Sequence, residues 1–237
     1  MAVPRKSKNT EDITFAKFKK SIQKYLNSYQ IKKIEKAFNV AKDAHHGQKR
    51  KSWENYINHP LSAAAYLADY ELDHETIMAA ILHDVVEDTE ISLENLGRTF
   101  GKKVAELVDG FSKLDKINFN SKEEADAANL RKMILAMSND IRVLLIKLAD
   151  RRHNLTTIGV LNKHKAKRIA RETLEIYAPL ALRLGIHNLS KELENLSFQT
   201  YYPLRYSILI ANIDKARGNR KLLMTKIKSE VTKKLNS

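Results

Sequence analysis

Apolar residues recur along most of the chain at spacings of three and four, which is the period of an α-helix with one buried face. No stretch alternates apolar and polar residues between turn residues, as strands do. Only 7 glycines and 4 prolines interrupt the 237 residues. The pattern therefore predicts an all-α fold, with one compact body to about residue 198 and a basic helical extension after it. The expected helices cover residues 12–27, 29–46, 60–70, 73–86, 92–99, 101–115, 122–138, 140–158, 163–183, 188–198, 202–216 and 219–235.

Several helix entries carry recognisable signals. Pro60 suits the first position of a helix, and Asp73, Ser92 and Asp140 stand where side-chain caps are expected. Gly110 lies inside an expected helix, and nothing in the local sequence explains it.

Composition narrows the class of protein. Hydrophobic residues make up 43% of the chain, enough for a substantial core, and the absence of cysteine excludes disulfides and thiolate metal sites. The first residues lack the apolar core of a signal peptide, and no stretch approaches the roughly 20 apolar residues that span a bilayer. A soluble, cytoplasmic protein is the default expectation.

Charge is unevenly distributed along the sequence, whose net charge is +14. Residues 1–51 hold 14 Lys and Arg against 4 Asp and Glu, and residues 202–237 hold 9 against 2, whereas residues 69–126 hold 6 against 15. The basic ends suit nucleic acid, a phosphorylated ligand or an acidic partner, or they are solvated helix faces. The acidic middle makes a bound cation plausible.

The stretch "AAILHDVVEDTE", residues 79–90, places polar side chains inside an apolar run. Read as one buried helix, it stacks His83 over Glu87 and Asp84 over Asp88, because residues four apart share a face. Buried charges are costly unless they are paired or bind metal. The stretch therefore predicts a site.

Two further apolar segments carry similar residues. "LLIKLADRRHN" delivers Asp150, and "YINHPLSAA" delivers His59 next to a proline. With His83 and Asp84 they form a candidate set of two histidines and two aspartates, which suits Mn²⁺, Fe²⁺ or Zn²⁺, although intrinsic affinity alone disfavours manganese. His153 either packs or orients another group.

These motifs resemble a known family. "HP", "LHDVVEDT" and "KLADRRHN" stand in the order and spacing of the HD superfamily of metal-dependent phosphohydrolases. "GQKRKS", "VAELVDGFSKLDKI" and "RIARETLEIYAPLALRLGI" are similar to the hydrolase domain of the RelA/SpoT family, and the end of the chain is most similar to its SpoT branch. The resemblance covers roughly residues 20–235.

The resemblance implies an HD-type helical bundle that hydrolyses ppGpp and pppGpp to GDP or GTP and pyrophosphate, usually with Mn²⁺, and so controls the stringent response. It implies residues 1–198 as the hydrolase domain and residues 199–237 as a connector towards a synthetase domain that this chain lacks. Regulatory domains of a longer chain are possible partners, and neither a membrane nor a nucleic acid is expected as one.

The resemblance also assigns roles to individual residues. It places His59, His83, Asp84 and Asp150 on the metal, and it gives Glu87 and Asp88 the orientation and activation of the attacking water. It implies contacts with the nucleotide for Arg50, Lys51, Ser52, Asn154, Thr157 and Tyr177.

Two other functions stay open at this point. One is an HD phosphohydrolase that acts on a different nucleotide. The other is a non-catalytic helical module that binds RNA or a partner through its basic ends, and the retention of every metal-binding residue and of Glu87 and Asp88 argues against it.

Overall fold

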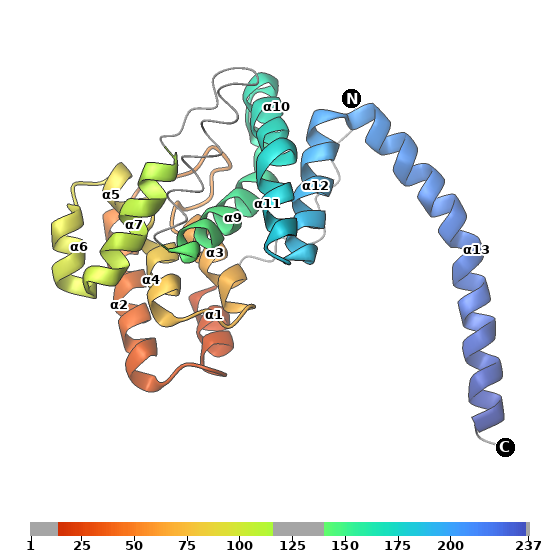
Figure 1. Ribbon diagram of the computed structural model, residues 1–237, viewed down its shortest axis with the longest axis horizontal. Helices are drawn as coiled ribbons and strands as arrows, with labels where there is room; N and C mark the ends of the chain where they lie inside the picture. The colour runs from red at the N-terminus through yellow and green to blue at the C-terminus, as the bar shows by residue number, and fades with distance from the viewer. Residues whose placement is uncertain (1–13, 116–139, 236–237) are drawn as a thin grey trace.

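The computed structural model describes residues 14–115 and 140–235, and within these ranges the chain consists of helices and their connections (Figure 1). Extended pairing among the described residues is confined to one isolated bridge between Lys49 and Asn55. The predicted all-α fold is confirmed, and the helix expected over 122–138 lies outside the described residues. The elements are α1 (Phe15–Ile22), α2 (Ser28–Ala44), α3 (Asn58–Ala68), α4 (His74–Leu82), α5 (Val85–Asp88), α6 (Leu93–Phe100), α7 (Lys102–Asp115), α9 (Ile141–Thr156), the 3-10 turn η1 (Ile158–Val160), α10 (Lys163–Glu172), the π-helical turn η2 (Thr173–Tyr177), α11 (Ala178–Arg183), α12 (His187–Tyr201) and α13 (Pro203–Leu235).

Side-chain caps begin several of these helices. Asp73, Ser92 and Asp140 each accept a hydrogen bond from a backbone N–H of the turn that follows, at 3.0, 3.2 and 3.0 Å. These three predicted entries are confirmed. Pro60 is the third residue of α3 and not the first, because the helix already begins at Asn58.

Helix α4 lies at the centre of the fold and packs against α2, α3, α7 and α9 (Figure 1). Every residue from Thr76 to Leu82 is buried, as expected for a helix that is apolar on all sides. Helix α9 also packs against α3 and α7. The core therefore brings together α3, α4 and α9, the helices whose sequences contain the polar residues singled out above.

Gly110 lets two of these helices approach closely. A Cβ atom at this position of α7 would lie 2.8 Å from Cγ2 of Val143 in α9. Real Cβ atoms do not come this close to another heavy atom, so the glycine in the middle of α7 has a packing reason.

The predicted buried helix over residues 73–86 is wrong in one respect that matters for the site. Helix α4 ends at Leu82, His83 and Asp84 form a turn, and the chain continues into the short helix α5. The His83 ring bonds the carbonyl oxygen of Ala80, one turn earlier, at 2.8 Å. Beyond the turn, Glu87 and Asp88 are exposed to solvent and not buried as the sequence indicated.

Further predicted helices also differ from the structure. The segment expected as a helix over 163–183 is helical throughout, but its middle is the π-helical turn η2 between α10 and α11. The two helices expected over 202–216 and 219–235 form the single helix α13, because one glycine, Gly218, costs only about 1 kcal/mol in a helix and does not end it.

Helix α13 leaves the body of the molecule (Figure 1). Near its start, Phe198 of α12 contacts the rings of Tyr202 and Tyr206, with centroid distances of 5.3 and 6.5 Å. On the same helix, Leu204 and Ile208 are 79% and 64% exposed. Among the described residues, no helix is both long enough and apolar enough to cross a membrane.

Candidate metal centre

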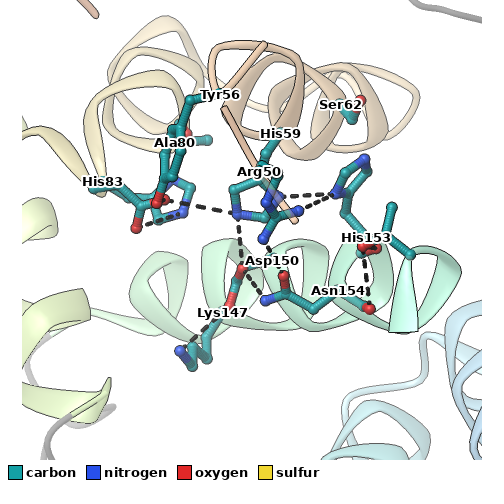
Figure 2. Close-up of polar contacts among 12 residues, drawn as sticks. Arg50, Tyr56, His59, Ser62, Ala80, His83, Lys147, Asp150, His153 and Asn154 are labelled. Carbon is teal, nitrogen blue, oxygen red and sulfur yellow. Dashed lines mark hydrogen bonds and ion pairs between the residues drawn. The ribbon is translucent and has the colours of Figure 1, made fainter. Parts of the chain in front are cut away.

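The predicted metal ligands come together from separate elements of the core (Figure 2). His59 lies in the first turn of α3, His83 and Asp84 form the turn after α4, and Asp150 lies in the middle of α9. His59, His83 and Asp150 are 2%, 1% and 4% exposed. Each of these three offers one nitrogen or oxygen atom, and all three atoms lie within 4.8 Å of one another.

The distances between these atoms are those of neighbouring ligands around one ion. Nε2 of His59 lies 3.1 Å from Oδ1 of Asp150, and Nε2 of His83 lies 3.1 Å from Oδ1 of Asp84. The other oxygen of Asp84, Oδ2, lies 3.7 Å from Nε2 of His59. Ligands about 2.1 Å from a cation and at right angles to each other are separated by ~3 Å. Asp84 therefore joins the group of three as a fourth candidate.

The proton positions at His83 provide a further test of the fit. Its Nδ1 lies 2.8 Å from the carbonyl oxygen of Ala80, which can only accept, so Nδ1 carries the proton. Nε2 is then the ring atom that remains for a ligand, and this buried nitrogen has no hydrogen-bond partner even though an Asp84 carboxylate oxygen is 3.1 Å away. A cation between the two atoms would satisfy both the nitrogen and the carboxylate. The residues thus fit a divalent metal.

Asp150 is held in its ionised form. Its Oδ1 accepts a hydrogen bond from Nδ2 of Asn154 at 2.6 Å, and its Oδ2 lies 3.3 Å from Nζ of the buried Lys147. Burial alone would raise the pKa of Asp150, but the ammonium of Lys147 and the contact with His59 outweigh it and hold the pKa well below the usual range. The centre therefore contains a buried carboxylate that can bind a cation.

Lys147 was not predicted as part of the site. It precedes Asp150 by three residues on α9, and its ammonium also lies over the ring of Phe111, 4.5 Å from the centroid. A lysine within the apolar run "LLIKLAD" was the available signal, because a buried lysine requires a partner.

The predicted catalytic pair lies at the edge of this centre. Glu87 and Asp88 occupy the last two positions of α5 and are exposed. The hydroxyl of Tyr56 donates to Oδ2 of Asp88 at 2.6 Å and lies 3.0 Å from Oδ2 of Asp84. The pair can therefore meet solvent and substrate while Asp88 stays linked to a metal-ligand candidate.

Tyr56 is a residue that the sequence analysis missed. Burial, then the charge of Asp84 and the hydrogen bond to Asp88, raise the pKa of its phenol, so it stays protonated and acts as a donor. Its ring stacks on His45, with centroids 4.5 Å apart. The signal was weak, because Tyr56 precedes His59 by three residues but lies outside the helix α3.

The residues predicted to contact the nucleotide lie in different surroundings. Arg50 reaches the centre, where its Nη2 donates to Oδ1 of Asn154 at 2.6 Å (Figure 2). Lys51 is exposed, and the hydroxyl of Ser52 is buried without a hydrogen-bond partner. Thr157 follows α9, where its hydroxyl bonds backbone carbonyl groups of that helix.

Tyr177 is the predicted residue whose surroundings fit the nucleotide site least. It is buried, at 2% exposure, in the π-helical turn η2. Its ring faces the guanidinium of Arg151, 4.4 Å from the centroid, and Arg151 in turn pairs with Glu172 at 3.0 Å. This contact connects α9 with the following helices.

Comparison with known proteins agrees with the geometry. The pattern that defines the HD domain matches residues 37–187. The chain is 55% identical over 221 residues, 93% of its length, to "Bifunctional (p)ppGpp synthase/hydrolase SpoT" of Escherichia coli, and 54% identical over 221 residues to "Guanosine-3′,5′-bis(diphosphate) 3′-pyrophosphohydrolase" of Vibrio cholerae. It is also 47% identical over 207 residues to "GTP pyrophosphokinase" of Streptomyces coelicolor.

These relatives are much longer than the chain. It spans 32%, 31% and 24% of their respective lengths, although 93%, 93% and 87% of the chain is matched. The HD pattern covers well over half of the sequence and includes all four candidate ligands. The chain therefore belongs to the HD domain family, and SpoT-type proteins are among its relatives.

Proposed function

We propose that this chain is a (p)ppGpp 3′-pyrophosphohydrolase, which converts ppGpp or pppGpp to GDP or GTP and pyrophosphate. The names of the Escherichia coli and Vibrio cholerae relatives support this choice of substrate. The observation that carries the proposal is the buried cluster of His59, His83 and Asp150, completed by Asp84, in which an imidazole nitrogen without a hydrogen-bond partner faces a carboxylate. Such a cluster suits the hydrolysis of a phosphate ester or anhydride.

His59, His83, Asp84 and Asp150 would hold one divalent cation, and we propose Mn²⁺ in that role. Two imidazole nitrogens and two carboxylates suit manganese as well as iron or zinc, so the choice among these metals rests on the family resemblance. When bound, the ion would supply Lewis-acid polarisation of a phosphate oxygen and activation of water.

Glu87 and Asp88 would manage the proton of the attacking water. Asp88 already accepts a hydrogen bond from Tyr56, which restrains its carboxylate beside Asp84. We therefore assign to Asp88 the orientation of the nucleophile and to Glu87, exposed one residue earlier, the acceptance of its proton.

Arg50 and Lys51 would bind the phosphates, because a polyanionic substrate needs cationic partners beside an acidic centre. Ser52 would face the nucleotide next to them. Asn154 and Thr157 are proposed to contact the nucleoside from the end of α9. Tyr177 keeps a proposed role on the phosphate side, although its observed contact is with Arg151.

The longer relatives support a multidomain setting for this activity. We propose residues 1–198 as the hydrolase domain and residues 199–237 as a connector. A synthetase domain and regulatory domains would follow in a longer chain.

The alternative is hydrolysis of a different nucleotide by the same centre. A panel of ppGpp, pppGpp, GTP, dGTP and cyclic nucleotides, each incubated with the chain and Mn²⁺, separates the two. Release of pyrophosphate from ppGpp and pppGpp alone is the expected result. Faster turnover of another nucleotide would favour the alternative.

A further inference from the structure

Five side chains around the metal centre form a closed ring of contacts (Figure 2). Arg50 Nη1 lies 3.2 Å from Nδ1 of His153, which lies 2.8 Å from Nδ1 of His59. On the other side, Arg50 Nη2 donates to Oδ1 of Asn154, whose Nδ2 donates to Oδ1 of Asp150, both at 2.6 Å. Asp150 Oδ1 and His59 Nε2, 3.1 Å apart, close the ring. Two of its members are metal-ligand candidates.

The arginine determines where the protons lie on one side of the ring. A guanidinium can only donate, so Nδ1 of His153 must accept. The single proton between the two imidazoles then belongs to Nδ1 of His59, and the lone pair of His59 lies on Nε2, directed at the carboxylates. This is the tautomer that binds a metal through Nε2.

The arginine also acts on the other side of the ring. Because Asn154 Oδ1 accepts from Arg50, its amide nitrogen faces Asp150 and donates to Oδ1. That bond orients the carboxylate towards His59. A single guanidinium thus acts on an imidazole ligand and on a carboxylate ligand at once, through the consecutive residues His153 and Asn154.

We propose that Arg50, in addition to its role with substrate, is a positioning residue that prepares His59 and Asp150 for the metal before any nucleotide binds. The inference rests on the proposed function only in that the metal is the one used for hydrolysis. The positioning role requires an arginine, because one planar guanidinium must donate to acceptors on two different side chains, whereas a lysine ammonium acts as a point charge.

The test is the affinity for Mn²⁺ in the absence of nucleotide, measured by isothermal titration calorimetry on the 237-residue chain. Arg50→Met and Arg50→Lys should each weaken binding about 10-fold or more, in line with the loss of other partners of metal ligands. Lys49→Gln removes the same charge from an exposed neighbour. Because Lys49 has no link to the ring, this substitution should change the Mn²⁺ affinity by less than about 2-fold. Circular dichroism tests whether each variant is folded. If Arg50→Met does not fold, the comparison is made with Arg50→Lys alone.

A double variant tests whether the effect travels through the ring. His153→Phe should weaken Mn²⁺ binding as Arg50→Met does, and the combination should lose no more than the larger single loss, since both interrupt the same arm. If the double variant instead loses the product of the two single losses, Arg50 and His153 act independently, and the proposed arm from Arg50 through His153 to His59 is wrong.

Wild-type Mn²⁺ affinity in both Arg50 variants would overturn the proposal and leave the hydrolase assignment untouched, because Arg50 would then act on substrate alone. Conversely, lost metal affinity in a chain that does not hydrolyse ppGpp would support the positioning role while the proposed function fails.

Discussion

The protonation of single ring nitrogens determines what this site can bind. Ala80 fixes the proton of His83 on Nδ1, and the Nε2 that remains faces Asp84. Burial, the largest cause, followed by the neighbouring His59 ring and the charge of Arg50, lowers the pKa of His153 to about 3, so its ring is neutral at neutral pH. Neutral imidazoles are the forms that coordinate metals.

Replacing a candidate ligand should remove the metal. His83→Ala and Asp84→Ala are each expected to lower Mn²⁺ affinity by more than about 100-fold, which exceeds the usual effect of outer partners. The measurement is the metal content of the purified chain by elemental analysis. His164→Ala, which removes an exposed histidine of α10, is the matched control and should leave the metal content unchanged. Wild-type metal content in the His83 variant would refute its assignment as a ligand.

The exposed carboxylates of α5 should affect turnover and not metal binding. Glu87→Gln together with Asp88→Asn removes proton acceptance but keeps an amide oxygen that can accept from Tyr56. Turnover of ppGpp is expected to fall by roughly 10²–10⁴-fold, with unchanged Mn²⁺ binding by calorimetry. Glu90→Gln is the control from the adjacent exposed segment. Near wild-type turnover in the double variant would mean that the proton acceptor lies elsewhere.

Some site residues could be predicted from sequence and others could not. His59, His83 and Asp150 stand out because each interrupts an apolar segment, and the structure brings them together. Tyr56 is an ordinary tyrosine in the sequence, and its importance depends on two carboxylates that another segment brings near it. Contacts between distant segments leave no local signal.

At the scale of whole elements, the contact between α7 and α9 depends on the absence of one side chain. Gly110→Ala should gain about 0.5–1 kcal/mol of helix propensity but lose about 1–3 kcal/mol from overpacking against Val143. We therefore expect a net destabilisation of about 1 kcal/mol, measured by urea unfolding.

The double-mutant cycle with Val143→Ala supplies the control. In that background the clash is gone, so Gly110→Ala should be neutral or stabilising. An equal loss of stability in both backgrounds would show that the contact with Val143 is not the reason for the glycine.

The start of α9 should show a pH-dependent stability. A hydrogen bond from Arg142, opposed by burial and aided by Lys103, holds the pKa of Asp140 below its usual value. A depressed carboxyl pKa stabilises the fold above the unfolded value of 3.8, and this contribution is lost as the pH falls through the folded value. Asp140→Asn keeps the cap but loses the charge, so it should cost about 1 kcal/mol at pH 7.

Urea unfolding of wild type and Asp140→Asn between pH 7 and pH 3 provides the measurement. The difference in the free energy of unfolding should stay constant down to about pH 4 and shrink below it. A difference that does not change down to pH 3 would contradict the ionic role of Asp140.

Helix positions were predictable from periodicity, but the interruption at the metal centre was not. The sequence of residues 73–86 has an unbroken helical pattern, and the turn at His83 and Asp84 reflects side-chain bonds that form only in the folded site. In residues 163–183 the interruption has a local cause as well, because Pro179 follows η2 and has no N–H to bond the carbonyl group of Glu175 within it. Tertiary contacts overrode local preference at His83 and Asp84.

At the scale of the whole molecule, a basic chain surrounds an acidic centre. The net charge is +14, yet the site itself is built from Asp84, Glu87, Asp88 and Asp150. A cation would offset these carboxylates, and in the proposed function Arg50 and Lys51 supply the positive charge for a polyanionic substrate. Helix α13 extends away from the helices that carry the centre (Figure 1).

In the proposed function, one metal centre in this chain removes the 3′-diphosphate of ppGpp. The most direct measurement follows the formation of GDP and pyrophosphate from ppGpp while Mn²⁺ is titrated into the metal-free chain. We expect equal amounts of the two products, a rate that rises in proportion to the occupancy of one site per chain, and complete loss of activity on chelation. Absence of turnover at full occupancy, or a rate that does not depend on the metal, would show that this centre is not the ppGpp hydrolase site.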